Sequence, residues 1–114
     1  MLTQMSIRNF ALIEQMNISF NDGITIFTGE TGAGKSILMD AFSILLGERA
    51  SSEFIRHGKD SFVIDGIFDI ANHQSLLDLL QSKNILVEDN QLILSRSFNT
   101  SGKSIILAND HPIP

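Results

Sequence analysis

The chain has 114 residues, of which 43% are hydrophobic, with a formal net charge of −5 and no cysteine. These values fit one modest globular domain, exclude disulfides and thiolate metal sites, and argue against a surface that coats DNA by itself. No secretory signal precedes the first predicted element, and no apolar run approaches the length of a membrane span, so we expect a cytoplasmic protein that does not enter a membrane.

The N-terminal half alternates between short strands and one helix. Alternating apolar residues predict strands at 5–10 and 15–20, followed by a turn at 21–23 and a short buried strand at 24–28. Apolar residues at helical spacing predict a helix over 36–46, which should end at Gly47.

The C-terminal half is predicted to hold more strands and a second helix. After an irregular stretch at 49–59, we expect a strand at 61–70, a helix at 72–83 capped by Asn72, and strands at 92–98 and 104–108 around a turn at 99–102. Four leucines of this helix, Leu76, Leu77, Leu79 and Leu80, should face the core. No regular element is predicted for 109–114, and this unfinished ending suggests a fragment of a longer protein.

One complete motif carries chemistry: Gly29, Glu30, Thr31, Gly32, Ala33, Gly34, Lys35 and Ser36 follow the phosphate-loop pattern of glycine, four residues, glycine, lysine and serine. The pattern lies between the predicted strand and helix, where backbone N–H groups and the helix N-terminus attract phosphate. Lys35 should reach the β- and γ-phosphates, and the Ser36 hydroxyl should bind Mg²⁺. We therefore predict an ATP–Mg²⁺ site.

Other candidate residues have simpler explanations. Taken alone, Arg49 is more simply a solvated residue after a helix than a second nucleotide-facing cation, and His57 has no partner that suggests catalysis. The segment 8–10 could lie near an adenine ring, although a core role for Phe10 is slightly preferred.

Two further patterns are discounted as sites. Asp65 and Asp69 alternate like outward residues of a strand rather than metal ligands. Gly102-Lys103-Ser104 copies the end of a phosphate loop, but it lacks the upstream glycine and lies in a predicted hairpin.

The parts needed for hydrolysis are not found after the phosphate loop. The chain contains no apolar strand that ends in Asp-Glu, no Leu-Ser-Gly-Gly segment and no convincing glutamine loop. We name no catalytic residue, and we expect the chain to bind ATP without efficient hydrolysis.

Several segments together resemble the N-terminus of the RecN family of bacterial DNA repair proteins. They are Ile7-Arg8-Asn9-Phe10-Ala11-Leu12-Ile13-Glu14, the phosphate loop with its flanks, Leu46-Gly47-Glu48-Arg49-Ala50 and Ile55-Arg56-His57-Gly58. Near the end, Lys103 stands for the family's usual arginine and Asn109-Asp110 for its Asn-Gly turn. The resemblance covers essentially the whole chain.

The resemblance implies an α/β fold, namely a P-loop NTPase head of the ABC/SMC type. Residues 1–114 would be its N-terminal part, a mixed and largely antiparallel sheet lobe with the phosphate-loop helix. The C-terminal half of the head and a coiled coil would lie elsewhere. Implied partners are that C-terminal half, a second head that sandwiches ATP, and DNA bound by the full-length protein during double-strand break repair and recombination. The same resemblance raises Arg49 to a nucleotide-facing candidate and implies association with the nucleoid.

Three alternatives stay open at this point. Another SMC- or RecF-like head would share the strand, loop and helix. A small kinase or GTPase would need a complete parallel sheet and a base-reading motif, and neither is found. A non-catalytic interaction module would make the glycine-rich loop incidental.

Overall fold

A computed structural model describes residues 1–20 and 32–113, and the side chains of residues 32–35 are outside this description. In the described part, six strands form one sheet in the order β2-β1-β3-β4-β5-β6, and every neighbouring pair is antiparallel. Their bounds are β1 Leu2–Phe10, β2 Ile13–Ser19, β3 Ser61–Asp69, β4 Gln91–Asn99, β5 Ser104–Ala108 and β6 His111–Ile113. The predicted turn at 21–23 and strand at 24–28 lie outside the described residues.

The five other predicted strands are confirmed, but the prediction of no element after residue 108 is wrong. Asn109 and Asp110 have φ values of 49° and 67°. Two consecutive left-handed residues form the tight turn that joins antiparallel strands. This turn allows β6 to pair with β5, with Ala108 opposite His111.

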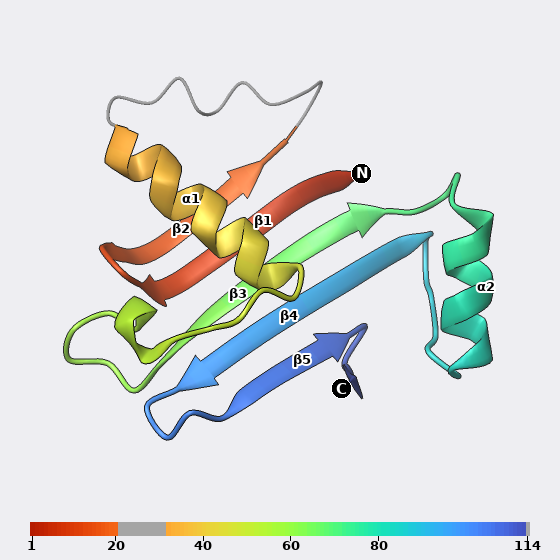
Figure 1. Ribbon diagram of the computed structural model, residues 1–114. Coiled ribbons are helices and arrows are strands. Elements are labelled where there is room, and N and C mark those ends of the chain that lie inside the picture. Colours follow the sequence, from red (N-terminus) through yellow and green to blue (C-terminus); the bar gives the residue numbers. More distant parts are fainter. Residues whose placement is uncertain (21–31, 114) are drawn as a thin grey trace.

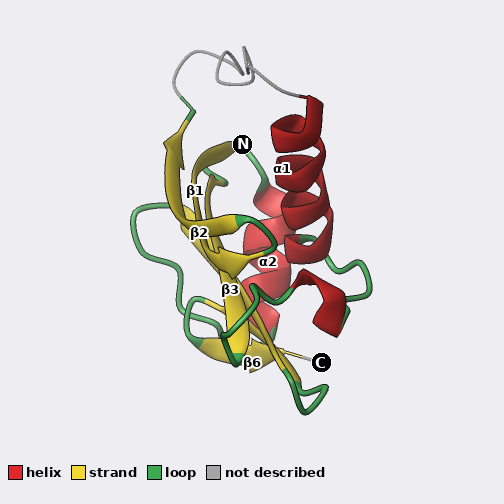
Figure 2. Cartoon of the chain, turned by 90° about the vertical axis from the view of Figure 1, so that its left-hand side faces the viewer, coloured by secondary structure: helices red, strands yellow, loops and turns green. Residues whose placement is uncertain are grey.

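Among the described residues, two α-helices accompany the sheet, α1 at Gly32–Leu45 and α2 at Gln74–Ser82. Figure 1 shows α1 crossing the sheet and α2 standing where β3 ends and β4 begins, and Figure 2 shows both helices on the same side of the sheet. The stretch predicted as irregular contains one short 3-10 helix, Ser52–Phe54. Neither helix of the described part is long and apolar enough to cross a membrane.

The predicted cap of α2 at Asn72 is wrong. The residue before the helix is His73, and its side chain makes no capping hydrogen bond. Nearby, the Asp69 carboxylate accepts a hydrogen bond from the Ala71 N–H at 3.0 Å. The side-chain acceptor therefore serves the end of β3 and not the first turn of the helix.

The buried apolar residues whose side chains are described form two clusters, one under each helix. The α1 cluster consists of Met5, Ile7, Phe10, Ile18, Ala41, Ile44, Leu45, Phe62 and Ile64. The α2 cluster consists of Ile70, Leu80, Ile85, Leu92 and Ala108. Of the four leucines predicted to face the core, Leu80 is buried, Leu76 and Leu77 are half-buried, and Leu79 is exposed, so the prediction holds for three of them.

A glycine lets α1 approach the sheet closely. A Cβ built on Gly66 of β3 would lie 2.6 Å from Cδ2 of Leu45, well inside van der Waals contact. Gly66 pairs with Met5 on one side and Leu94 on the other, so the gap lies in the middle of the sheet. The last turn of α1 therefore packs against β3 at Gly66, where the strand has no side chain.

Candidate nucleotide-binding site

The structure describes only part of the predicted phosphate loop. Residues 32–36 form the first turn of α1, whereas Gly29, Glu30 and Thr31 lie outside the described residues. Ser36, the first residue of the motif with a described side chain, is exposed. Because the first N–H groups of a helix have no partner within it, this end of α1 presents donors and a partial positive charge. No acidic side chain in the first turn offsets that charge.

The position of this helix end is set by the packing of the rest of α1. Ala41, Ile44 and Leu45 belong to the α1 cluster and are at most 3% exposed. They recur at the three- and four-residue spacing that puts side chains on one helix face. Ile37 and Leu38, closer to the start of the helix, are partly buried and pack against the same cluster. The helix is therefore held on the sheet along its length from residue 37, and its first turn extends from that part.

The C-terminal end of α1 is closed as predicted at Gly47. The Gly47 N–H donates to the Ile44 carbonyl at 3.1 Å, and the Glu48 N–H donates to the Ser43 carbonyl at 3.0 Å. This pair of bonds is the Schellman turn, which requires a left-handed residue, and Gly47 has a φ of 119°. Arg49 follows this turn and is exposed.

Sequence reasoning missed Arg96, the buried charged residue of the described part. Its Nη1 donates to the carbonyls of Ile44 at 2.7 Å and Glu48 at 2.9 Å, and its Nε donates to Oγ of Ser104 at 2.9 Å. Burial lowers the pKa of the Arg96 guanidinium, which stays charged because the ordinary value is so high. A signal existed: Arg96 alternates in phase with apolar Leu94 and Phe98 along β4.

Phe10 is a core residue, as the preferred interpretation held. Its ring is fully buried, stacks on Phe54 at 5.0 Å and meets Phe62 edge-on at 5.0 Å. A ring held in this way cannot stack on a base. The neighbouring Arg8 is exposed.

His57, Asp65 and Asp69 were interpreted from the sequence as surface or outward-facing residues rather than as site residues. His57 and Asp69 are exposed, and Asp65 is half-buried. The described residues contain no group of three or more potential metal ligands. Gly102 has a φ of 84° in the turn between β4 and β5, so the Gly-Lys-Ser sequence there is a hairpin and not a phosphate loop.

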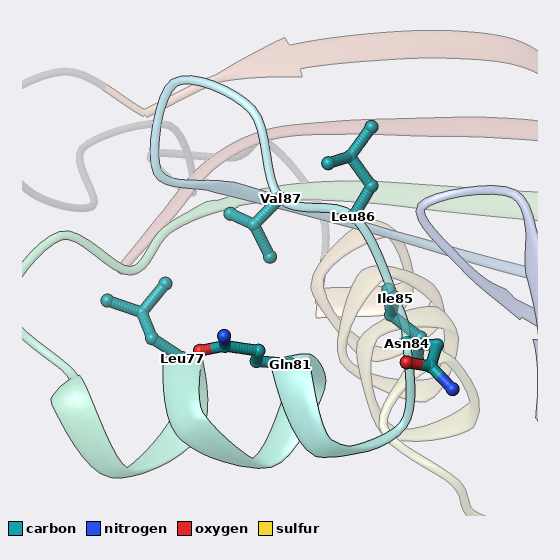
Figure 3. A pocket seen from close by; sticks show the side chains of 6 residues that line it. All are labelled: Leu77, Gln81, Asn84, Ile85, Leu86 and Val87. Atoms are coloured by element: carbon teal, nitrogen blue, oxygen red, sulfur yellow. The ribbon is translucent and has the colours of Figure 1, made fainter.

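A shallow groove lies beside α2. It is lined by Leu77, Gln81, Asn84, Ile85, Leu86 and Val87. Figure 3 shows Leu77 and Gln81 on the helix and residues 84–87 on the segment that connects α2 to β4, with Leu86 pointing away from α2. None of these residues belongs to the phosphate loop, so the groove is separate from the candidate site.

Residues 4–106 match the family described as the AAA domain. The chain belongs to this family. It is 44% identical over 109 residues to DNA repair protein RecN of Bacillus subtilis, covering 96% of this chain and 19% of the relative. It is 37% identical over 114 residues to RecN of Vibrio cholerae, covering 100% of this chain and 20% of the relative. The predicted resemblance to RecN is thus confirmed, and the chain spans about a fifth of the length of these relatives.

Solved structures confirm the predicted fold class for this AAA-domain chain. An SMC head domain from Thermotoga maritima aligns with a TM-score of 0.73 at 19% identity, covering 99% of this chain and 38% of that one. The recombination mediator protein RecF with ATP aligns with a TM-score of 0.71 at 18% identity, covering 99% and 27%. The described chain therefore shares the fold of a part of SMC- and RecF-type heads.

Proposed function

We propose that this chain binds ATP with Mg²⁺ through Gly29–Ser36 as residues 1–114 of an ABC/SMC-type ATPase head. The observation that carries the proposal is a complete phosphate-loop sequence that runs into the N-terminus of α1. Lys35 supplies the charge on the β- and γ-phosphates, and the exposed Ser36 supplies a hydroxyl for Mg²⁺.

Similarity to RecN supports a role for the whole protein in DNA double-strand break repair. In that role, the C-terminal half of the head and a second head complete the ATP site, and the full-length protein contacts DNA in the nucleoid. Arg49 is a further nucleotide-facing cation. The carboxylate that activates water is supplied from outside this chain, so the chain alone binds ATP without efficient turnover. The RecN relatives, at 37–44% identity, favour this role over that of a RecF-like head.

Replacing Lys35 with alanine tests the proposal directly. Lys35→Ala should abolish Mg²⁺–ATP binding, because the loop loses the cation that holds the terminal phosphates. Isothermal titration calorimetry of the chain with Mg²⁺–ATP measures the affinity, and the ATP-dependent rise in melting temperature gives a second readout.

The hairpin between β4 and β5 offers a matched control. Lys103→Ala removes a lysine from the same local Gly-Lys-Ser sequence and should leave ATP affinity unchanged. Micromolar ATP affinity retained by Lys35→Ala would reject the proposed site, as would equal losses in the two variants.

A further inference from the structure

Asp40 is the acidic residue of α1, and it lies one helical turn after Ser36. The only other charged residue in the sequence of this helix is Lys35. Ser36 and Asp40 are both exposed, whereas Ala41 and Leu45 are buried against the sheet. Residues four positions apart lie on the same face of an α-helix. The side chains of Ser36 and Asp40 are therefore neighbours on the face of α1 that points away from the sheet.

The direction of helical side chains brings the Asp40 carboxylate toward Ser36. Each Cα–Cβ bond of a helix is tilted toward the N-terminus, so a side chain covers the turn before its own. The second helix already uses this spacing: Nε2 of Gln74 donates to Oδ1 of Asp78 at 2.9 Å. An aspartate of this chain thus reaches back to the polar side chain four residues earlier.

The charge of Asp40 favours a nucleotide that carries a metal ion. Four residues of a helix span about 6 Å, which is less than the Debye length of about 8 Å at physiological ionic strength. A carboxylate at this distance from the first turn of α1 repels the phosphates of metal-free ATP. The same carboxylate is attracted to a Mg²⁺ ion held at Ser36.

The Ser36 hydroxyl can bind a metal ion and donate a hydrogen bond at the same time. Mg²⁺ takes oxygen ligands, and a hydroxyl offers lone pairs to the ion while its proton remains free for an acceptor. Because Ser36 lies in the first turn of α1 and Asp40 in the next, the phosphates and the carboxylate approach the hydroxyl from opposite ends of the helix axis. A group that accepts the proton of a metal ligand fixes the orientation of that ligand.

We propose that Asp40 is a positioning residue, which accepts the proton of the Ser36 hydroxyl when Mg²⁺–ATP is bound. It thereby makes the site select Mg²⁺–ATP over metal-free ATP. This inference rests on the proposed function. Asp40 itself contacts neither the nucleotide nor the metal ion, because it acts through Ser36. Its effect on ATP affinity must therefore depend on both the metal ion and the hydroxyl.

ATP affinity measured with and without Mg²⁺ tests this inference. Isothermal titration calorimetry is carried out on the parent chain and on Asp40→Ala, first with excess Mg²⁺ and then with EDTA. In Mg²⁺ the variant should bind roughly fivefold more weakly, because the hydroxyl loses its charged acceptor. In EDTA it should bind as tightly as the parent or up to about threefold more tightly, because a repulsive charge is gone.

Two further variants test whether the effect passes through Ser36. Ser36→Ala should weaken Mg²⁺–ATP binding, and adding Asp40→Ala to it should cause no further loss, because coupled residues are not additive. Asp40→Glu keeps a carboxylate at the same helical spacing, so it should bind Mg²⁺–ATP within about twofold of the parent.

Asp78→Ala is the matched control. It removes an exposed aspartate that has the same four-residue spacing, and it changes the net charge of the chain by the same amount. Because α2 carries no residue of the phosphate loop, this variant should bind ATP as the parent does, both in Mg²⁺ and in EDTA.

The outcomes distinguish this inference from the proposed function. Unchanged or tighter Mg²⁺–ATP binding by Asp40→Ala would overturn the inference, and so would equal losses in Mg²⁺ and in EDTA. A further loss in the Ser36→Ala background, or an equal loss in Asp78→Ala, would also overturn it. The proposed function fails instead if the parent does not bind ATP or if Lys35→Ala binds as the parent does.

Discussion

The two helices end in the same hydrogen-bonded turn, but different contacts hold the two turns. After α2, Ile85 is 5% exposed and belongs to the same buried cluster as Leu80, the residue whose carbonyl it binds. That apolar contact commonly accompanies the Schellman turn. After α1, the equivalent pair is Glu48 and Ser43, which offers no apolar contact, and Arg96 takes its place.

The two helix ends differ in the sequence distance of the contacts that stabilise them. The α2 turn is closed by residues five positions apart, so it depends on its own segment. The α1 turn is held by a residue 48 and 52 positions away, on a strand that α1 covers. The helix that carries the phosphate-loop residues is therefore the one whose end depends on a strand distant in the sequence. Changes in the α1 cluster should reach the nucleotide site, and changes in the α2 cluster should not.

The largest expected effect comes from emptying the α1 cluster. Phe62→Ala should lower the free energy of unfolding by about 3–5 kcal/mol, because a fully buried ring leaves a cavity. Phe62 meets Phe10 edge-on and lies 5.9 Å from Phe98, so neighbours on two strands lose contacts. Urea denaturation followed by circular dichroism measures the change.

Leu80→Ala is the matched change in the α2 cluster. It should cost about 2–3 kcal/mol, the lower part of the range for such truncations, because α2 lies at the end of the sheet and can settle into the space. Equal or larger destabilisation by Leu80→Ala would contradict the view that the α1 cluster dominates the stability of the chain.

A smaller effect is expected where α1 touches the sheet. Gly66→Ala should cost about 1–3 kcal/mol, because the new methyl group overlaps the Leu45 side chain. The same change made in a Leu45→Ala background should be neutral or stabilising, since the methyl group then enters vacated space. Unfolding energies of the four variants give the coupling, and additive costs would show that the close approach at Gly66 is not what matters.

Sequence reasoning recovered the parts of this structure that local patterns specify. Alternation in β3 and β4 and helical spacing in α1 mark their buried faces, and Gly47 marks the end of a helix, because each needs only neighbours in the chain. Asn84, which ends α2 with a φ of 59°, has a weaker signal than glycine because asparagine is common in loops.

Features that depend on distant contacts were missed. Arg96 lies in phase with apolar residues, but its carbonyl acceptors become neighbours only when α1 packs on β4. The short β6 was missed because its pairing depends on the Asn109–Asp110 turn and on β5 rather than on an apolar pattern of its own. The phosphate-loop motif could be recognised from the sequence because its defining residues are consecutive in the chain.

The smallest expected effects sharpen the comparison of the two helix ends. Gly47→Ala should cost about 1–2 kcal/mol through backbone strain alone, because a side chain at Gly47 would meet no atom within 4 Å. Asn84→Gly should change the unfolding energy by only a few tenths of a kcal/mol, because both residues accept the left-handed region. If Arg96 is the main contact that holds the α1 turn, the Gly47→Ala variant should keep the turn and its backbone should be strained. In an Arg96→Lys background the turn can relax, so Gly47→Ala should then lower the free energy of unfolding by less. A cost of Gly47→Ala that is unchanged or larger in that background, measured by urea unfolding, would show that the arginine and the glycine close the turn independently.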